Sequence, residues 1–146
     1  PYEGWVKSFH PNGTLKSLGF LKSGQKEGLR ISWHDNGQKR EEAHFKGDVM
    51  DGPLKAWHPN GTQGAEGLVK DGEMTGRWME WYSTGVKRKA HRCRDGIFIS
   101  AVVWRPDGEL CPETNATGGK GVVLEYEENG SVKERRVYRD GVAASE

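Results

Sequence analysis

The sequence lacks the long apolar runs from which membrane spans are built. Among its 146 residues, no stretch reaches the roughly 18 apolar residues that a membrane-crossing helix needs. The longest apolar stretches, Ile97–Ile99 and Ala101–Trp104, have the length of strands. Charge of one sign is also missing, because 22 basic and 21 acidic side chains leave a net charge of +1. This balance excludes a bulk attraction to nucleic acid or to an anionic membrane, so neither partner is expected.

Cysteine is scarce as well, with only Cys93 and Cys111. Cys93 follows the turn glycine Gly85 by eight residues, and Cys111 follows the turn glycine Gly108 by three. In the β-strands expected below, these distances place the two cysteines on opposite faces of a sheet, two strands apart. A disulfide needs Cα atoms within about 7 Å of each other. We therefore expect both thiols to be unpaired in a regular register.

Glycine is abundant, with 21 residues, and a turn motif recurs at steps of 24, 24, 24, 23 and 22 residues. A period of this length must be considered before any other feature, since it determines the fold. The six turns are Pro11-Asn12-Gly13, Asp35-Asn36-Gly37, Pro59-Asn60-Gly61, Ser83-Thr84-Gly85, Pro106-Asp107-Gly108 and Glu128-Asn129-Gly130. An aromatic residue stands four positions before each turn glycine: Phe9, Trp33, Trp57, Trp81, Trp104 and Tyr126.

Each unit contains two short runs divided by a glycine turn, which is the signal of a β-hairpin. No run between glycines is long enough for a helix. We therefore predict an all-β chain forming a single elongated, twisted antiparallel sheet of about six tandem β-hairpin repeats, a β-meander solenoid, in one domain over residues 1–146. The expected units are 4–27, 28–51, 52–75, 76–99, 100–120 and 121–146. In the fifth unit Pro112 removes a ladder donor, so its second half is expected to be a loop or a broken strand.

The Pro-Asn-Gly turns predict a three-residue loop whose glycine takes a left-handed conformation. In the first unit this loop sets Phe9 opposite Leu15 and Trp5 opposite Gly19. Strand alternation then gives one shared face in each of the first two units. The two expected sets are Trp5, Lys7, Phe9, Leu15, Ser17, Gly19 and Leu21, and Leu29, Ile31, Trp33, Lys39, Glu41, Ala43 and Phe45.

Successive units lie about 10 Å apart, so the aromatic residues of neighbouring units are too distant to stack directly. The residue two positions after each turn glycine fills the gap between them. In two units this residue is a lysine, Lys39 or Lys87, and we expect its stem to lie between aromatic rings with cation–π contact.

Histidine recurs once per unit, at His10, His34 and His58. Zinc–nitrogen bonds are only about 2 Å long, so side chains about 10 Å apart cannot share one ion, and no metal site is expected. The sequence also lacks a nucleophile–base arrangement and a phosphate-binding loop. We therefore expect no catalytic residues, no cofactor and no enzymatic activity.

The densest charge lies on one strand of the fourth unit, at Lys87-Arg88-Lys89, His91-Arg92 and Arg94. Two interpretations stay open. One is a solvated strand that resists aggregation at its edge. The other is a docking point for an acidic partner.

The pattern Gly4-Trp5, then Phe9-His10-Pro11-Asn12-Gly13-Thr14-Leu15-Lys16-Ser17 and Gly19, resembles the variant MORN repeat of bacteria. The stretch 107–115, followed by Gly119-Lys120-Gly121, is similar to an irregular unit of that family. The resemblance covers nearly the whole chain. It implies an immunity protein or antitoxin, which neutralises a toxin or effector by binding it and occluding its active site. The fourth unit departs most from the family pattern, at Thr84, Lys87 and His91.

Interface anchors are usually Trp, Tyr and Arg, and the fourth unit concentrates these residue types. The expected partner-binding residues are Trp57, Trp78, Trp81, Tyr82, Arg88 and Arg92. The partner is expected to be a protein, and open sheet edges leave an edge-to-edge homodimer as a further option.

Two alternatives remain. One is a structural or surface-associated repeat module of an exported envelope protein, and the other, less favoured, is an enzyme with an unrecognised site. A bacterial source follows from the resemblance, and the compartment stays open between cytoplasm and periplasm. The chain begins at Pro1 without Met. If a leader has been removed before Pro1, the periplasm is favoured.

Overall fold

The computed structural model describes residues 1–144, and these residues contain strands and turns but no helix. Accordingly, none of the described residues forms a helix that could span a membrane. The predicted all-β antiparallel meander of hairpins is confirmed. The chain divides into two compact units, residues 1–73 and 74–146.

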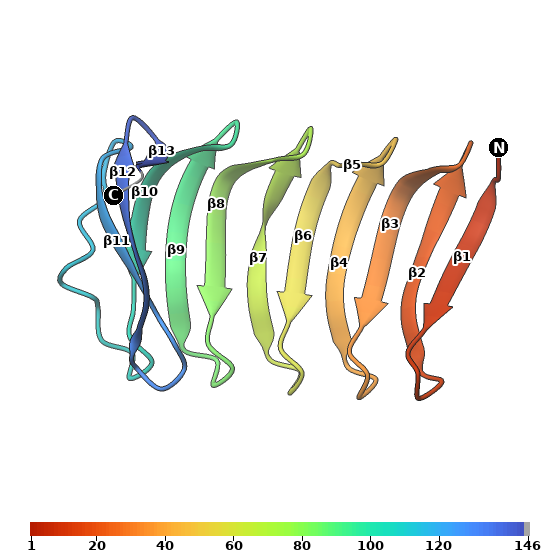
Figure 1. The fold of residues 1–146 in the computed structure, drawn as a ribbon, viewed down its shortest axis with the longest axis horizontal. Helices are drawn as coiled ribbons and strands as arrows, with labels where there is room; N and C mark the ends of the chain where they lie inside the picture. Colours follow the sequence, from red (N-terminus) through yellow and green to blue (C-terminus); the bar gives the residue numbers. More distant parts are fainter. Residues whose placement is uncertain (145–146) are drawn as a thin grey trace. The chain divides into compact units, whose positions relative to one another are not determined.

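The first unit is a regular meander of three hairpins (Figure 1). Its strands pair in the order β1-β2-β3-β4-β6-β7, and the short β5 also pairs with β4. The strands are β1 (Gly4–Phe9), β2 (Leu15–Lys22), β3 (Gln25–Trp33), β4 (Lys39–Lys46), β5 (Val49–Met50), β6 (Gly52–Trp57) and β7 (Gln63–Lys70).

The second unit contains two groups of strands. The first is β8 (Glu73–Trp81), β9 (Lys87–Arg94) and β10 (Ile97–Val103), and the second is β11 (Gly121–Tyr126), β12 (Val132–Arg139) and β13 (Val142–Ala144). The latter three form a separate three-stranded sheet. The expected single sheet is therefore interrupted, because the chain around Pro112 forms no named strand. Only isolated bridges, such as Trp104↔Leu110, occur there. The break predicted in the fifth sequence repeat, residues 100–120, is confirmed.

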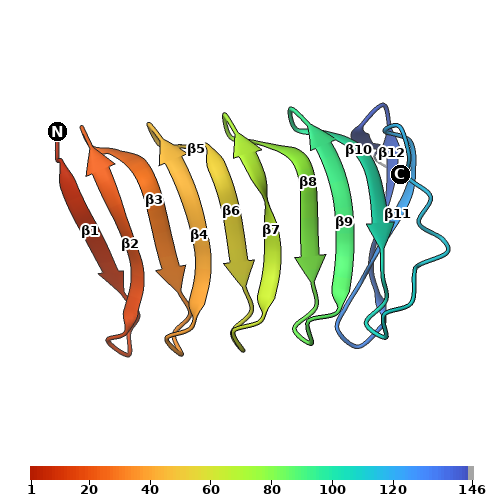
Figure 2. The same cartoon turned by 180° about the vertical axis from the view of Figure 1, so that it is seen from behind.

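The two kinds of turn in the first unit have different backbone geometry and lie along opposite ends of its strands (Figures 1 and 2). At one end His10 and Thr14 flank the predicted three-residue loop, with Gly13 at φ +85°. At the other end the loops have two residues, both at positive φ, as in Asp71 (50°) and Gly72 (82°). Such type I′ turns favour Asp-Gly, which explains why this dipeptide recurs in the sequence.

One part of the predicted register is wrong. Phe9 does pair with Leu15, but Trp5 pairs with Phe20 and not with Gly19. The register shifts between Ser8 and Phe9, which leaves Lys16 unpaired as a β-bulge. One extra residue reverses the face of every side chain that follows it on that strand. The expected face sets are therefore correct on the first strand of each hairpin and wrong beyond the bulge on the second.

The core of the second unit lies between its two groups of strands. Tyr82, Val103 and Cys111 are buried in it together with Val123, Leu124 and Tyr126 of the last hairpin. The ring of Phe98 on β10 stacks on Tyr138 of β12, with centroids 4.0 Å apart. The last hairpin thus packs against β8–β10.

Gly121 leads into this packed hairpin and provides a stability test. Its φ is +128°, and an added Cβ would lie 2.6 Å from the carbonyl oxygen of Asn115 and 2.7 Å from the Cα of Ala116. Gly121→Ala should therefore cost more than about 3 kcal/mol of unfolding free energy, from strain and overlap together. Gly76→Ala is the matched control, since Gly76 has φ +70° but nothing within 4 Å of its Cβ position. That variant should cost about 1 kcal/mol. Urea unfolding would measure both, and equal losses would contradict the packing at Gly121.

Candidate functional site

The first unit carries an aromatic row, which we define as Phe9, Trp33 and Trp57 at the ends of β1, β3 and β6. Each of these residues pairs with the residue two positions after the turn glycine, as Trp33 does with Lys39 and Trp57 with Gln63. The Nζ of Lys39 lies 5.3 Å from the ring centroid of Trp57, in the next hairpin. In the second unit, Lys87 Nζ lies 5.7 Å from the ring centroid of Trp104. The predicted insertion of lysine between aromatic rings is confirmed.

Side-chain hydrogen bonds from one turn to the next hold this row in register. The Nε2–H of His10 donates to the carbonyl oxygen of Trp33 (2.8 Å), and His34 makes the same bond to Trp57 (2.8 Å). Beside them, Asn12 Nδ2 donates to the carbonyl oxygen of Asp35 (2.9 Å). The repeated histidines are therefore connectors between hairpins. No group of side chains that could hold a metal ion occurs in the described part of the chain.

The same face carries two further rows parallel to the aromatic row. The row farthest from the Asn-Gly turns is mainly apolar, and its members are paired as Trp5↔Phe20, Leu29↔His44 and Pro53↔Leu68. Between it and the aromatic row lies a mixed charged row that includes Lys7, Glu42, Lys55 and Glu66. We call these three rows together the ladder face.

Large apolar side chains on the ladder face are exposed. The exposed fractions are 61% for Trp5, 60% for Phe9, 45% for Leu68 and 39% for Leu29. Trp33 and Trp57 are half-buried. The opposite face of the first unit carries small buried residues such as Ser17 and Ala43, and also Val6, which is 40% exposed. The two most exposed large apolar side chains of the unit, Trp5 and Phe9, therefore lie on the ladder face.

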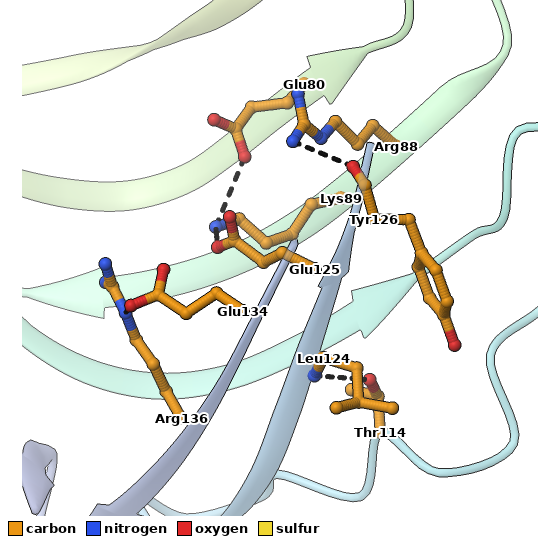
Figure 3. Close-up of polar contacts among 9 residues, drawn as sticks. All are labelled: Glu80, Arg88, Lys89, Thr114, Leu124, Glu125, Tyr126, Glu134 and Arg136. Carbon is orange, nitrogen blue, oxygen red and sulfur yellow. Dashed lines mark hydrogen bonds and ion pairs between the residues drawn. The ribbon is translucent and has the colours of Figure 1, made fainter. Parts of the chain in front are cut away.

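In the second unit, charged side chains replace small ones on the corresponding strand positions. Glu80 occupies the position of Ser32 and Ala56 in earlier hairpins, and His91 that of Ala43. Lys89 reaches from β9 to Glu125 of β11 (2.5 Å) and to Glu80 of β8 (3.3 Å) (Figure 3). This network was not predicted from the sequence. Glu80 and His91 stand where the earlier hairpins have small residues, and this difference is the sequence signal that could have revealed the network.

Burial and charge act in opposite directions on this network. Burial alone would lower the pKa of the Lys89 ammonium, but the attraction of Glu80 and Glu125 outweighs it and raises the pKa. Burial likewise opposes ionisation of Glu125, but its hydrogen bond from Lys89 dominates and lowers the pKa. Lys89 and Glu125 are therefore both charged near neutral pH, and they neutralise each other in part.

A cavity of about 440 Å³ lies in the second unit beside the Lys89 network, and its wall includes His91, Cys93, Arg136 and Tyr138. Burial, followed by the positive charge of Lys89, lowers the pKa of His91 to about 4, so its ring is neutral at pH 7. The ring stacks on Trp78 with centroids 6.2 Å apart. Within the described residues, His91 Nδ1 and Trp78 Nε1 are buried without a hydrogen-bond partner.

The six residues expected from the sequence to bind a partner differ in their burial. Tyr82 is fully buried and Trp78 is 7% exposed. The Tyr82 hydroxyl donates to the carbonyl oxygen of Trp104 (2.8 Å), and desolvation raises its pKa to about 12. Arg88 donates to the carbonyl oxygen of Tyr126 (3.0 Å; Figure 3). The other three are more accessible, with Trp57 and Trp81 half-buried and Arg92 exposed.

The basic strand β9 is engaged within the second unit more than either interpretation of its sequence assumed. The Lys87 ammonium lies over the Trp104 ring, and Arg88 donates to the Tyr126 carbonyl. Lys89 contacts two carboxylates, those of Glu80 and Glu125. Lys87, Arg92 and Arg94 are the exposed basic residues of this strand. The thiols of Cys93 and Cys111 are both free, as the sequence predicted, and both are buried.

The family model described as the MORN repeat variant matches residues 2–23, 26–46 and 120–140. These stretches correspond to the hairpins β1–β2, β3–β4 and β11–β12, so the resemblance to this repeat is confirmed there. The MORN repeat variant indicates a repeat-based binding module. No curated protein matches the chain.

The Lys89 network leads to a stability prediction. Lys89→Met should lower the unfolding free energy of the second unit by about 2 kcal/mol, because it leaves the 18%-exposed Glu125 side chain without its counterion. Lys120→Met is the matched control: Lys120 lies 3.7 Å from Asp140, with side chains 73% and 86% exposed. It should change stability by less than about 0.5 kcal/mol. Equal effects of the two variants in urea unfolding would contradict a stabilising role for Lys89.

His91 should make the second unit sensitive to acid. Its pKa of about 4 in the folded chain lies below the ordinary value of 6.5, so the unfolded chain binds the proton more readily. The resulting stability is complete above pH 6.5 and is lost as the pH falls toward 4, by about 2 kcal/mol after allowance for the partial exposure of the ring. His91→Ala, which installs the residue found at the equivalent position 43, should remove this component of the pH dependence. His10→Gln, at a half-buried histidine of the first unit, should retain it. Chemical denaturation at several pH values between 7 and 4 tests this, and an unchanged profile in His91→Ala would refute it.

Proposed function

We propose that this protein is a non-catalytic binding module that neutralises a toxin or effector protein by covering its active site with the ladder face. The observation that carries the proposal is the exposure of large apolar side chains on one face of a regular sheet, led by Trp5 and Phe9. Large exposed apolar side chains gathered on one face and bordered by polar residues mark interaction sites in soluble proteins.

The composition of the ladder face supports a protein partner. Aromatic anchors surrounded by polar groups are typical of binding hot spots. Here the mixed charged row, with Lys7 and Lys55 exposed beside Glu66, separates two rows of apolar and aromatic side chains. Charges of both signs allow the partner to be oriented without strong attraction to nucleic acid.

The toxin-neutralising part of the proposal comes from the resemblance to variant MORN repeats of bacterial immunity proteins and antitoxins. The match of three hairpins to the MORN repeat variant supports the binding-module part. An extended repeat face fits occlusion, because it can cover an active site without supplying reactive groups of its own.

The test begins with capture of the tagged protein's partner from its source organism, followed by expression of that partner alone and together with this protein. We expect one stoichiometric partner that is toxic alone and harmless when co-expressed. Trp5→Ala combined with Phe9→Ala should weaken binding at least about tenfold, since exposed aromatic anchors contribute most at interfaces. Leu110→Ala, which truncates an equally exposed side chain (60%) in the second unit, is the matched control and should bind normally.

Two outcomes would count against the proposal. A partner whose expression is harmless would remove the toxin-neutralising function. A partner that binds the Trp5/Phe9 double variant as tightly as it binds the unmodified protein would remove the ladder face as the site.

A further inference from the structure

We infer that the outer edge of β1 binds a β-hairpin supplied by another protein chain, through the same joint that connects the hairpins of the first unit. The chemistry of the joint specifies this occupant: a strand antiparallel to β1, preceded by a turn that carries histidine and asparagine. The inference goes beyond the proposed function, because it concerns the edge of the sheet and does not require the partner to be a toxin.

The joint between hairpins of the first unit combines three contacts. The histidine of one turn donates to the carbonyl of the aromatic residue in the next hairpin, and the asparagine donates to a carbonyl of the next turn. On the opposite face, the Arg30 side chain packs over Gly19 of the preceding strand, with its Cγ 3.3 Å from the position of an added Cβ. Ala43, the equivalent of Gly19 in the second hairpin, is also small and buried. Each joint therefore needs histidine, asparagine and a small residue from the preceding hairpin.

The β1 edge presents the receiving half of this joint. Its residues stand one repeat of 24 residues before those that receive the contacts elsewhere: Phe9 for Trp33, Pro11 for Asp35 and Val6 for Arg30. Among the described strands, only β2 pairs with β1, which is the first strand of its sheet (Figure 1). No described hairpin therefore supplies a histidine or an asparagine to the carbonyls of Phe9 and Pro11, or a small residue beneath Val6.

Main-chain groups for strand pairing are open on the same edge. The Trp33 carbonyl faces the preceding hairpin, where it accepts from His10, so the equivalent Phe9 carbonyl faces the free edge. Successive residues of a strand direct their main-chain groups to opposite sides, and Lys7 and Trp5 therefore face this edge too. The Trp5 carbonyl accepts from the Tyr2 hydroxyl (3.3 Å). The N–H and C=O groups of Lys7 and Phe9 are left for an added strand.

Apolar exposure is concentrated along this edge. Trp5 and Phe9 are the most exposed large apolar side chains of the unit, and Val6 is exposed on the other face. Trp33, the equivalent of Phe9 with a strand on each side, is half-buried. An apolar edge strand readily accepts another strand, and a charged residue such as Lys7 discourages indiscriminate pairing. The side-chain contacts of the joint then determine which strand is accepted.

A second copy of this chain fits the edge less well than a hairpin from another protein. Two β1 strands related by twofold symmetry run antiparallel, so His10 of each copy lies beside the start of β1 in the other copy, far from the Phe9 carbonyl. Pairing Trp5 with Phe9 of the other copy also sets the two Lys7 residues opposite each other, and like charges directly opposite are destabilising. Self-pairing thus leaves the joint unfilled.

The experiment uses a cyclic peptide of residues 4–21, closed by an Asp-Gly turn, as the incoming hairpin. Its second strand is β2, which makes this joint with β3 in the protein. Titrated into the full-length ¹⁵N-labelled protein, the peptide should bind saturably and shift the main-chain N–H signals of Lys7 and Phe9 downfield. Lys7→Pro removes an N–H that faces the free edge and should weaken binding at least about tenfold. Lys7→Ala retains this N–H and should bind normally. Circular dichroism of both variants verifies that the fold is retained.

Changes in the peptide test the joint without altering the protein. His10→Ala in the peptide removes the donor to the Phe9 carbonyl and should weaken binding about fivefold. Gly19→Leu fills the place where the Val6 side chain packs and should weaken binding at least about tenfold. Lys16→Ala, at the exposed bulge residue, is the matched control and should bind like the unmodified peptide.

Four outcomes would overturn the inference. They are absence of saturable binding, full binding by Lys7→Pro, equal binding of all the peptides, and a dimer of the unmodified protein that Lys7→Pro dissociates in sedimentation, which would assign the edge to a second copy. If the peptides fail while a captured partner still requires Trp5 and Phe9, the proposed function stands and only the edge joint is rejected. If the peptide binds as expected and no toxic partner is captured, the joint stands and the toxin-neutralising function is rejected.

Discussion

Hydrogen bonds from the side chains of one turn to the main chain of the next hairpin set the geometry of the first unit. His10 and His34 each reach a tryptophan carbonyl 23 residues ahead, and Asn12 and Asn36 reach the corresponding turn carbonyls. An added or deleted residue within a hairpin would move these acceptors out of reach. The bonds therefore require a constant repeat length, and the constant length in turn gives the aromatic row its even spacing.

The second unit keeps this connection at Tyr82 and then departs from it. The Tyr82 hydroxyl takes the place of the histidine and donates to the carbonyl of Trp104. In the following repeat, Arg105 instead lies over the Tyr126 ring, 5.9 Å from its centroid, after which the chain leaves the ladder. The last hairpin then packs against β8–β10. This packing covers the face of β8–β10 that corresponds to the small-residue face of the first unit. The covered face must therefore accommodate buried side chains, and Lys89 joins β8 and β9 to the last hairpin through Glu80 and Glu125.

The features that were predictable from the sequence are local ones. The three-residue loops, the lysine between aromatic rings and the break at Pro112 each depend on a few adjacent residues and their turn chemistry. The register beyond Lys16 was not predictable, because a single bulged residue reverses the face of the strand without a distinct sequence signal. The burial of Tyr82 was also hidden, since it depends on a hairpin that begins about 40 residues later in the chain. The Lys89–Glu125 pair, separated by 36 residues, was hidden for the same reason.

The same residue types therefore have different roles in the two units. Tyr82 and Trp78 are buried in the second unit, whereas Trp5 and Phe9 remain exposed in the first, where no second layer packs on the ladder face within that unit. Concentration of Trp, Tyr and Arg in a stretch of sequence indicates an interface only if tertiary packing leaves those side chains accessible. In a repeat protein, a constant repeat length keeps these side chains accessible. Each hairpin that keeps the repeat length places its aromatic residue level with the aromatic residues of its neighbours, on the same face.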